Sequence, residues 1–261
     1  MRRQGAPLPI AILAVAGALF FILPLAGLIL RTPWGDAVAA LTSADTLQAL
    51  RLSLIASLSA TGLAIVLGVP LAWVYARVDF PGRSIMRALT TLPMVLPPVV
   101  GGIALLLAFG RSGLVGGWLD SALGLTVPFT TLAVVLAETF VAMPFLILTV
   151  EAGLRSMDRR YEDAARTLGA SRWTVFSRVT MPLVAPSLFA GAVLCWARAL
   201  GEFGATITFA GNFPGVTQTM PLAVYLLLES NPEGSFVLSL ILLAVSLVVL
   251  VGLRDRWLGS A

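Results

Sequence analysis

The sequence predicts an all-α, polytopic membrane protein with six transmembrane helices and one cytoplasmic loop that carries two short helices. Of the 261 residues, 58% are hydrophobic and only 11% are charged, and the mean hydropathy is +0.96. No ordinary soluble domain has this composition. The apolar residues also gather into runs near the length of about 20 residues that a helix needs to cross about 30 Å of hydrocarbon.

These runs predict a single transmembrane domain over residues 1–261. We place the spans at about 8–30, 50–75, 88–109, 128–148, 183–205 and 236–253. The first run could instead be a signal peptide, but it exceeds the usual apolar region of about 7–15 residues and no clean small-residue cleavage site follows. Residues 220–228 are apolar but too few to cross, so we expect a surface or re-entrant helix on the outer side.

The arginines indicate the orientation of the chain. With a cytoplasmic N-terminus and alternating spans, the outside holds only Arg31, Arg51 and Arg111. The inside then holds Arg2, Arg3, Arg77, Arg83, Arg87, Arg155, Arg159, Arg160, Arg166, Arg172, Arg178, Arg254 and Arg256. This distribution satisfies the positive-inside rule, so we expect both termini in the cytoplasm. The formal charge of +4 therefore reflects topology and does not indicate a nucleic-acid partner.

The loop between the fourth and fifth spans, at residues 159–181, has helical rhythm without being apolar enough to cross. Spacings of i, i+3, i+4 and i+7 place four residues on one helix face: Tyr161, Ala164, Ala165 and Leu168. Gly169 supplies a stop, Ser171 can cap a second short helix that carries Trp173, and Pro182 ends that helix. Such an arginine-rich pair could lie on anionic lipid or dock against another protein, and periodicity alone favours neither.

Two charged residues stand inside the fifth span. Arg198 and Glu202 are four residues apart, so they share a helix face and can pair. A charge at mid-membrane costs about 2.5–3.5 kcal/mol on insertion scales, which makes such residues functional candidates. They form either a structural ion pair near the outer end of the span or part of the translocation path or its gate. Thr206 could add a weak hydrogen-bond donor near the outer mouth of the translocation path.

Other polar or helix-breaking groups in the spans have two interpretations each. Pro97 and Pro98, with Pro93, free backbone carbonyls in the third span, which is tolerated against protein or a wet cavity. They either kink the helix for packing or belong to a helix that lines a pathway. Glu138 in the fourth span has no nearby lysine or histidine and is expected to be neutral or to bond between helices.

The residue inventory argues against chemistry within this chain. There is no lysine, so the chain cannot form the phosphate-binding loop of a P-loop ATPase. There is also no histidine, and Cys195 is a single cysteine in an apolar run. We therefore expect no catalytic residues, no metal and no cofactor in a protein that is not itself an enzyme.

The cytoplasmic loop resembles the EAA motif of ABC importer permeases, a pattern of E-A-A, three residues, G, nine residues and I-x-L-P. Asp163 stands where the motif has glutamate, Gly169 is its glycine, and residues 179–182 (V-T-M-P) are its end. The resemblance implies that the loop docks on an ATPase subunit. The residues it assigns to that coupling are Tyr161, Asp163, Ala164, Ala165, Leu168, Gly169 and Trp173.

Two further segments resemble the permease subunits of molybdate ABC importers. They are residues 92–102 (L-P-M-V-L-P-P-V-V-G-G) and 197–212, which contain G-E-F-G-A-T-I-T-F. The resemblance implies a multi-pass protein of a bacterial or archaeal inner membrane. It further implies that two copies of this chain form a pore surrounded by membrane lipid. The partners of this pore would be an ABC ATPase dimer and an extracytoplasmic oxyanion-binding protein. Alternatives are a sulfate/thiosulfate permease and an ion-coupled secondary transporter, although the sequence lacks the internal repeat common in the latter.

Overall fold

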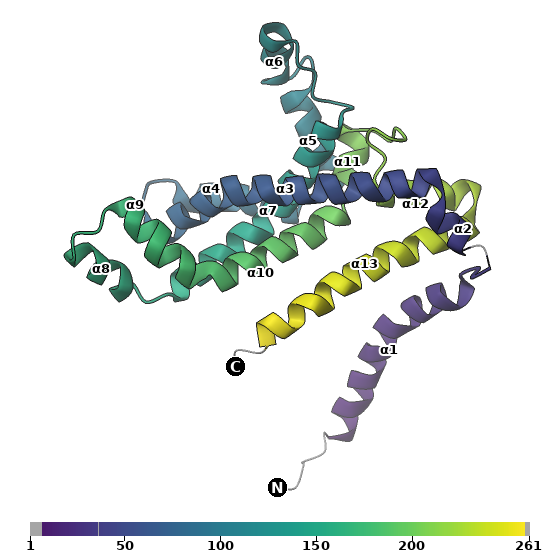
Figure 1. Ribbon diagram of the computed structural model, residues 1–261, viewed down its shortest axis with the longest axis horizontal. Helices are drawn as coiled ribbons and strands as arrows, with labels where there is room; N and C mark the ends of the chain where they lie inside the picture. Colours follow the sequence, from purple (N-terminus) through teal and green to yellow (C-terminus); the bar gives the residue numbers. More distant parts are fainter. Residues whose placement is uncertain (1–6, 36, 259–261) are drawn as a thin grey trace.

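The computed structural model describes residues 7–35 and 37–258, with side chains as far as residue 248. Arg2 and Arg3 lie outside the described residues. Within them every regular element is helical, which confirms the predicted fold class (Figure 1). Among the described residues, four helices are long and apolar enough to cross a membrane, or five if one bent pair is a single span. The count of six spans and their boundaries stay predictions.

The centre of the molecule is a bundle of α3 (Ala44–Arg77), α7 (Thr131–Ser156) and α10 (Met181–Leu200), whose buried side chains form one cluster. Small residues let the helices approach closely. A Cβ atom on Gly153 of α7 would lie 2.3 Å from the hydroxyl oxygen of Ser187 on α10. A Cβ on Gly191 of α10 would lie 3.2 Å from the backbone of α7. The bundle thus combines tight helix contacts with large buried side chains such as Tyr75 and Leu146.

The predicted third span differs from a straight helix. It consists of α4 (Arg83–Thr91) with a following 3₁₀ turn to Met94, then α5 (Pro98–Phe109), and the two parts are bent by 117°. Pro97 is extended, with φ −54° and ψ 129°. Two successive prolines remove two N–H donors and disfavour helix in the residue before each ring, so the helix breaks here.

The helix that contains most of the predicted fifth span starts before the apolar run does. It begins at Arg172 with α9 (Arg172–Val175), continues through a π-helical stretch and α10, and ends at Leu200 before Gly201. The expectation that Pro182 ends the second loop helix is wrong, because the chain stays helical through it. The π turn (Phe176–Thr180) ends two residues before this proline and includes Arg178, whose carbonyl four residues back the proline ring would otherwise meet.

The remaining helices surround the bundle (Figure 1). The loop helices α8 (Arg160–Thr167) and α9 lie at one end of it, and α2 (Ala37–Thr42) and α12 (Met220–Ser230) lie at the other. Residues 220–228 thus lie at the bundle end opposite the loop helices, and their outer position stays a prediction. The other elements are α1 (Leu8–Arg31), which has no buried residue, α6 (Gly116–Leu123), α11 (Gly204–Phe209) and α13 (Pro232–Leu258).

Candidate functional site

The loop between α7 and α10 ends its first helix with a glycine motif. Gly169 has φ +84°, the left-handed conformation that glycine adopts without a steric cost. Its N–H donates to the carbonyl of Arg166 at 3.0 Å, and the N–H of Ala170 donates to that of Ala165 at 3.0 Å. These two bonds form a Schellman motif. Gly169 therefore sets the direction in which the chain leaves α8, as its position in the sequence predicts.

The second loop helix starts at its predicted cap. The hydroxyl of Ser171 accepts a hydrogen bond from the N–H of Thr174 at 3.1 Å, which satisfies one of the free donors of α9. The ring of Trp173 packs on Phe176, with centroids 5.6 Å apart, and Phe176 in turn meets Trp73 of α3 at 6.1 Å. Aromatic contacts thus connect the second loop helix to the central bundle.

The first loop helix is fixed to the bundle by a buried carboxylate. Glu162 is 4% exposed, and its Oε2 lies 3.1 Å from Nε of Arg77 at the end of α3. Its Oε1 accepts a hydrogen bond from the hydroxyl of Thr180 at 2.7 Å. Thr180 is the last residue of the π turn that leads into α10. One side chain therefore connects α8 to both α3 and α10.

Glu162 is the functional candidate that the sequence did not reveal. The motif comparison directs attention to Asp163, but that side chain is 67% exposed and pairs at 3.3 Å with the half-exposed Arg166. Exposed pairs of this kind contribute little stability. No periodicity relates positions 77, 162 and 180, since they belong to three different elements. Only the fold brings them together.

Six of the seven residues predicted to contact a partner are exposed, and Ala165 is half-buried. Three large apolar side chains stand out among them. Tyr161 is 59% exposed, Leu168 88% and Trp173 72%. They stand on helices that also carry several arginines, at the bundle end away from α2 and α12. Exposed apolar side chains gathered in this way are typical of a surface that another molecule covers.

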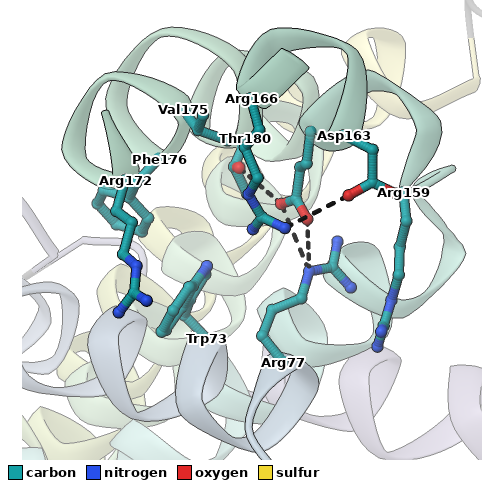
Figure 2. Close-up of a pocket in the computed structure, with 10 residues that line it drawn as sticks. Trp73, Arg77, Arg159, Asp163, Arg166, Arg172, Val175, Phe176 and Thr180 are labelled. Atoms are coloured by element: carbon teal, nitrogen blue, oxygen red, sulfur yellow. Dashed lines mark hydrogen bonds and ion pairs between the residues drawn. The ribbon is translucent and has the colours of Figure 1, made fainter. Parts of the chain in front are cut away.

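A cavity of about 600 Å³ lies between the loop helices and the end of α3 (Figure 2). Four arginines and two acids are among its lining residues, which are Trp73, Arg77, Arg159, Glu162, Asp163, Arg166, Arg172, Val175, Phe176 and Thr180. The positive charges outnumber the negative ones. Arg159 also donates to the backbone carbonyl of Ala76 at 3.3 Å, which adds another contact between the loop and α3.

The predicted pair at the end of the fifth span is present. Nη2 of Arg198 lies 2.6 Å from Oε2 of Glu202, and the Glu202 side chain is 1% exposed. The other oxygen of Glu202 accepts a hydrogen bond from the N–H of Ala205 at 2.8 Å, in the first turn of α11. Glu202 therefore joins the end of α10 to α11 across the break at Gly201.

The other predicted pathway residues lie on elements that cross close by. Pro97 and Pro98 are exposed at the start of α5, whereas Thr206 on α11 is fully buried. A Cβ on Gly204 would lie 2.7 Å from Cβ of Pro98, and one on Gly102 would lie 1.7 Å from the hydroxyl oxygen of Thr208. The close crossing of α5 and α11 thus requires glycine at both positions.

The interior near this crossing contains polar atoms without a partner. Oε2 of Glu138 and the hydroxyl of Thr206 are both buried and make no hydrogen bond within the described part of the chain. Glu138 is near enough to Glu202 for the two carboxyls to interact electrostatically. In residues 7–35 and 37–258, no three His, Cys, Asp or Glu side chains gather as a metal site would require.

Comparisons with known proteins agree on one family. The family "Binding-protein-dependent transport system inner membrane component" matches residues 64–258. The chain is 46% identical, over 93% of its length and 92% of the relative, to the "Molybdenum transport system permease protein ModB" of Mycobacterium bovis. It is 40% identical to the protein of that name from Escherichia coli K12, over 81% of this chain and 93% of the relative. It is 35% identical to the "Sulfate transport system permease protein CysT" of E. coli K12, over 90% of this chain and 86% of the relative.

A solved structure shows the same fold. It is a bacterial ABC transporter "involved in the import of the acidic polysaccharide alginate", with a TM-score of 0.71 over 95% of this chain and 92% of that one. The sequences are 19% identical.

Proposed function

The chain belongs to the family of binding-protein-dependent transport system inner membrane components, and we propose that it is the permease subunit of an ATP-driven molybdate importer. The observation that carries this proposal is the 46% identity to a molybdenum permease over nearly the whole of both chains. The transported group is the tetrahedral oxyanion. Its selection is expected mainly in a binding protein, because tight binding in the pore would block passage.

The exposed loop face supports docking on an ATPase subunit. Leu168 and Trp173 offer apolar surface, and the chain has no lysine with which to build a phosphate-binding loop of its own. The arginine distribution supports a cytoplasmic position for this loop and both termini, on the side where ATP is available. ATP binding would close a dimer of ATPases and displace α8, while two copies of this chain form the pore.

The buried carboxylate supports a route by which that displacement reaches the membrane. Glu162 connects α8 to Arg77 on α3 and to Thr180 at the start of α10. At its other end, α10 leads to Glu202 and through it to α11. A tilt of α8 would therefore move α10 as a lever, and α11 with α5 would follow because these two helices are in close contact.

The runner-up is transport of sulfate or thiosulfate by the same machinery. A sulfate permease relative at 35% identity favours it, although less than the molybdenum relatives favour molybdate. An ion-coupled transporter is a weaker alternative, because the family is defined by dependence on a binding protein.

Uptake in a reconstituted system tests the proposal. The permease is expressed with its neighbouring ATPase and binding-protein genes, and the complex is placed in vesicles with ATP. We expect ATP-dependent accumulation of molybdate, with sulfate transported at least about tenfold more slowly, a difference of about 1.4 kcal/mol in favour of molybdate. Equal rates for the two anions would favour the runner-up. Uptake that continues without ATP, or a chain that purifies without an ATPase, would exclude the importer.

Substitution of Gly169 tests the loop geometry. A Cβ at this position meets nothing within 4 Å, so the effect of Gly169→Leu comes from forcing a side chain into φ +84°, which costs about 1–2 kcal/mol. We expect normal insertion and ATPase activity but reduced uptake per ATP. Gly169→Asn is the control, since asparagine tolerates this conformation and should retain most uptake. Wild-type coupling in the leucine variant would contradict the role of the loop.

A further inference from the structure

The arginine-lined cavity under the loop has positive charge that the protein does not neutralise. Arg77 is paired with Glu162, and Arg166 with Asp163. Arg159 and Arg172 line the same cavity and form no ion pair with any described residue. Figure 2 shows their side chains on opposite sides of the space, with Arg77 and Arg166 between them. The cavity therefore has the charge to receive an anion.

One polar atom at this cavity is buried and has no partner. The Arg77 side chain is 7% exposed, and its Nη2 forms no hydrogen bond in the described structure although its Nε is bound to Glu162. A buried guanidinium nitrogen without an acceptor is unfavourable, because it has lost its hydrogen bonds to water. An oxyanion in the cavity could accept from Nη2, and arginine suits phosphate because it presents several donors in one plane.

A second cavity shares part of its wall with the first and has a different chemistry. It has a volume of about 450 Å³ and is lined by Pro70, Trp73, Val74, Arg172, Trp173 and Phe176. Trp73, Arg172 and Phe176 belong to the walls of both cavities. Apart from the arginine, the second lining is apolar and mostly aromatic. Together the two spaces match a molecule with an anionic group at one end and a hydrocarbon chain at the other.

We propose that these adjoining cavities bind one anionic phospholipid of the cytoplasmic leaflet. Its phosphate would lie among Arg77, Arg159 and Arg172, and an acyl chain would lie against Trp73 and Phe176. The location is suitable, because the apolar sequence of α3 ends here at Arg77. Basic pockets between helices on the cytoplasmic side are also typical sites for anionic headgroups. This lipid would fill the space between the loop and the bundle, next to the proposed ATPase contact, to which Trp173 of the second cavity also belongs.

Lipid binding to the detergent-purified full-length permease, measured by native mass spectrometry, tests the site. The probes are phosphatidylglycerol, phosphatidylcholine with the same acyl chains, and inorganic phosphate. We expect one phosphatidylglycerol per chain to bind at least about tenfold more tightly than either other probe. This comparison uses the unmodified protein, so it does not depend on a variant that folds.

A matched pair of variants locates the lipid. Arg159→Gln with Arg172→Gln should weaken phosphatidylglycerol binding at least about tenfold. Arg160→Gln with Arg178→Gln removes the same charge from exposed arginines that do not line the cavity, and should change binding less than about threefold. Equal weakening by both pairs would show a general charge effect and overturn the site.

Three other outcomes would also overturn the proposal. Equal binding of the two lipids would remove the role of the arginines, and equal binding of inorganic phosphate would remove the role of the apolar cavity. If the double variant Arg159→Gln with Arg172→Gln no longer binds the ATPase subunit while its lipid binding is unchanged, the cavity receives an acidic group of that subunit instead. Failure of the lipid site leaves molybdate uptake intact, so it is distinguishable from failure of the proposed function.

Discussion

Replacement of Glu162 by Ala is expected to reduce ATP-driven uptake at least about tenfold while the protein still inserts into the membrane. The change leaves Arg77 buried without its carboxylate and Thr180 without its acceptor. Removing one partner of a buried pair typically costs about 3–5 kcal/mol. That loss acts where α8, α3 and α10 meet, so the loop should move independently of the bundle. Uptake and ATP hydrolysis in the same vesicles measure the loss of coupling.

The control for this prediction is Asp158→Asn. Asp158 is an acidic residue of the same loop, but it is half-exposed and its ion pair with Arg160 spans 4.0 Å at the surface. Its replacement should leave uptake nearly unchanged, since exposed pairs contribute about 0–1 kcal/mol. Combining Glu162→Gln with Arg77→Gln should cost less than the sum of the two single changes, because no buried charge is left alone. Normal uptake in Glu162→Ala would show that the loop acts without this carboxylate.

Replacement of Glu202 by Gln is the second large effect that we expect. The amide oxygen can still accept from Ala205, so the start of α11 keeps its bond, but Arg198 loses its counter-charge within the membrane. Uptake or the basal ATPase rate of the complex should change more than insertion does. Transport assays and the thermal stability of the purified complex are both measured, since the two readouts separate function from structure.

The double variant Arg198→Gln with Glu202→Gln decides between the two interpretations of the pair. Removing both charges should recover stability in either case. If the pair belongs to the path or its gate, uptake stays low after stability returns. Recovery of uptake together with stability would identify a purely structural pair. Glu229→Gln, an exposed carboxylate on α12, controls for the loss of one negative charge.

Local features of the loop could be predicted because each depends on neighbouring residues. Gly169 stops α8 and Ser171 caps α9, since both effects act within one helical turn. The Arg198–Glu202 pair is equally local, being four residues apart on one helix. The end of the second loop helix at Pro182 was predicted wrongly, because a π turn lets the helix continue through a proline that the sequence pattern indicates as a stop.

Composition and apolar run length by themselves predicted an all-α membrane protein, and the resemblance of its loop and two further segments to known permeases indicated the family. These properties depend on how many residues of one kind occur and how far apart they lie along the chain. The tertiary structure alone decided that Glu162, rather than Asp163, is the buried acid of the loop, and that two arginines under the loop form no ion pair with any described residue. Burial and charge pairing depend on which helices meet, and α3, α8 and α10 are brought together only by folding.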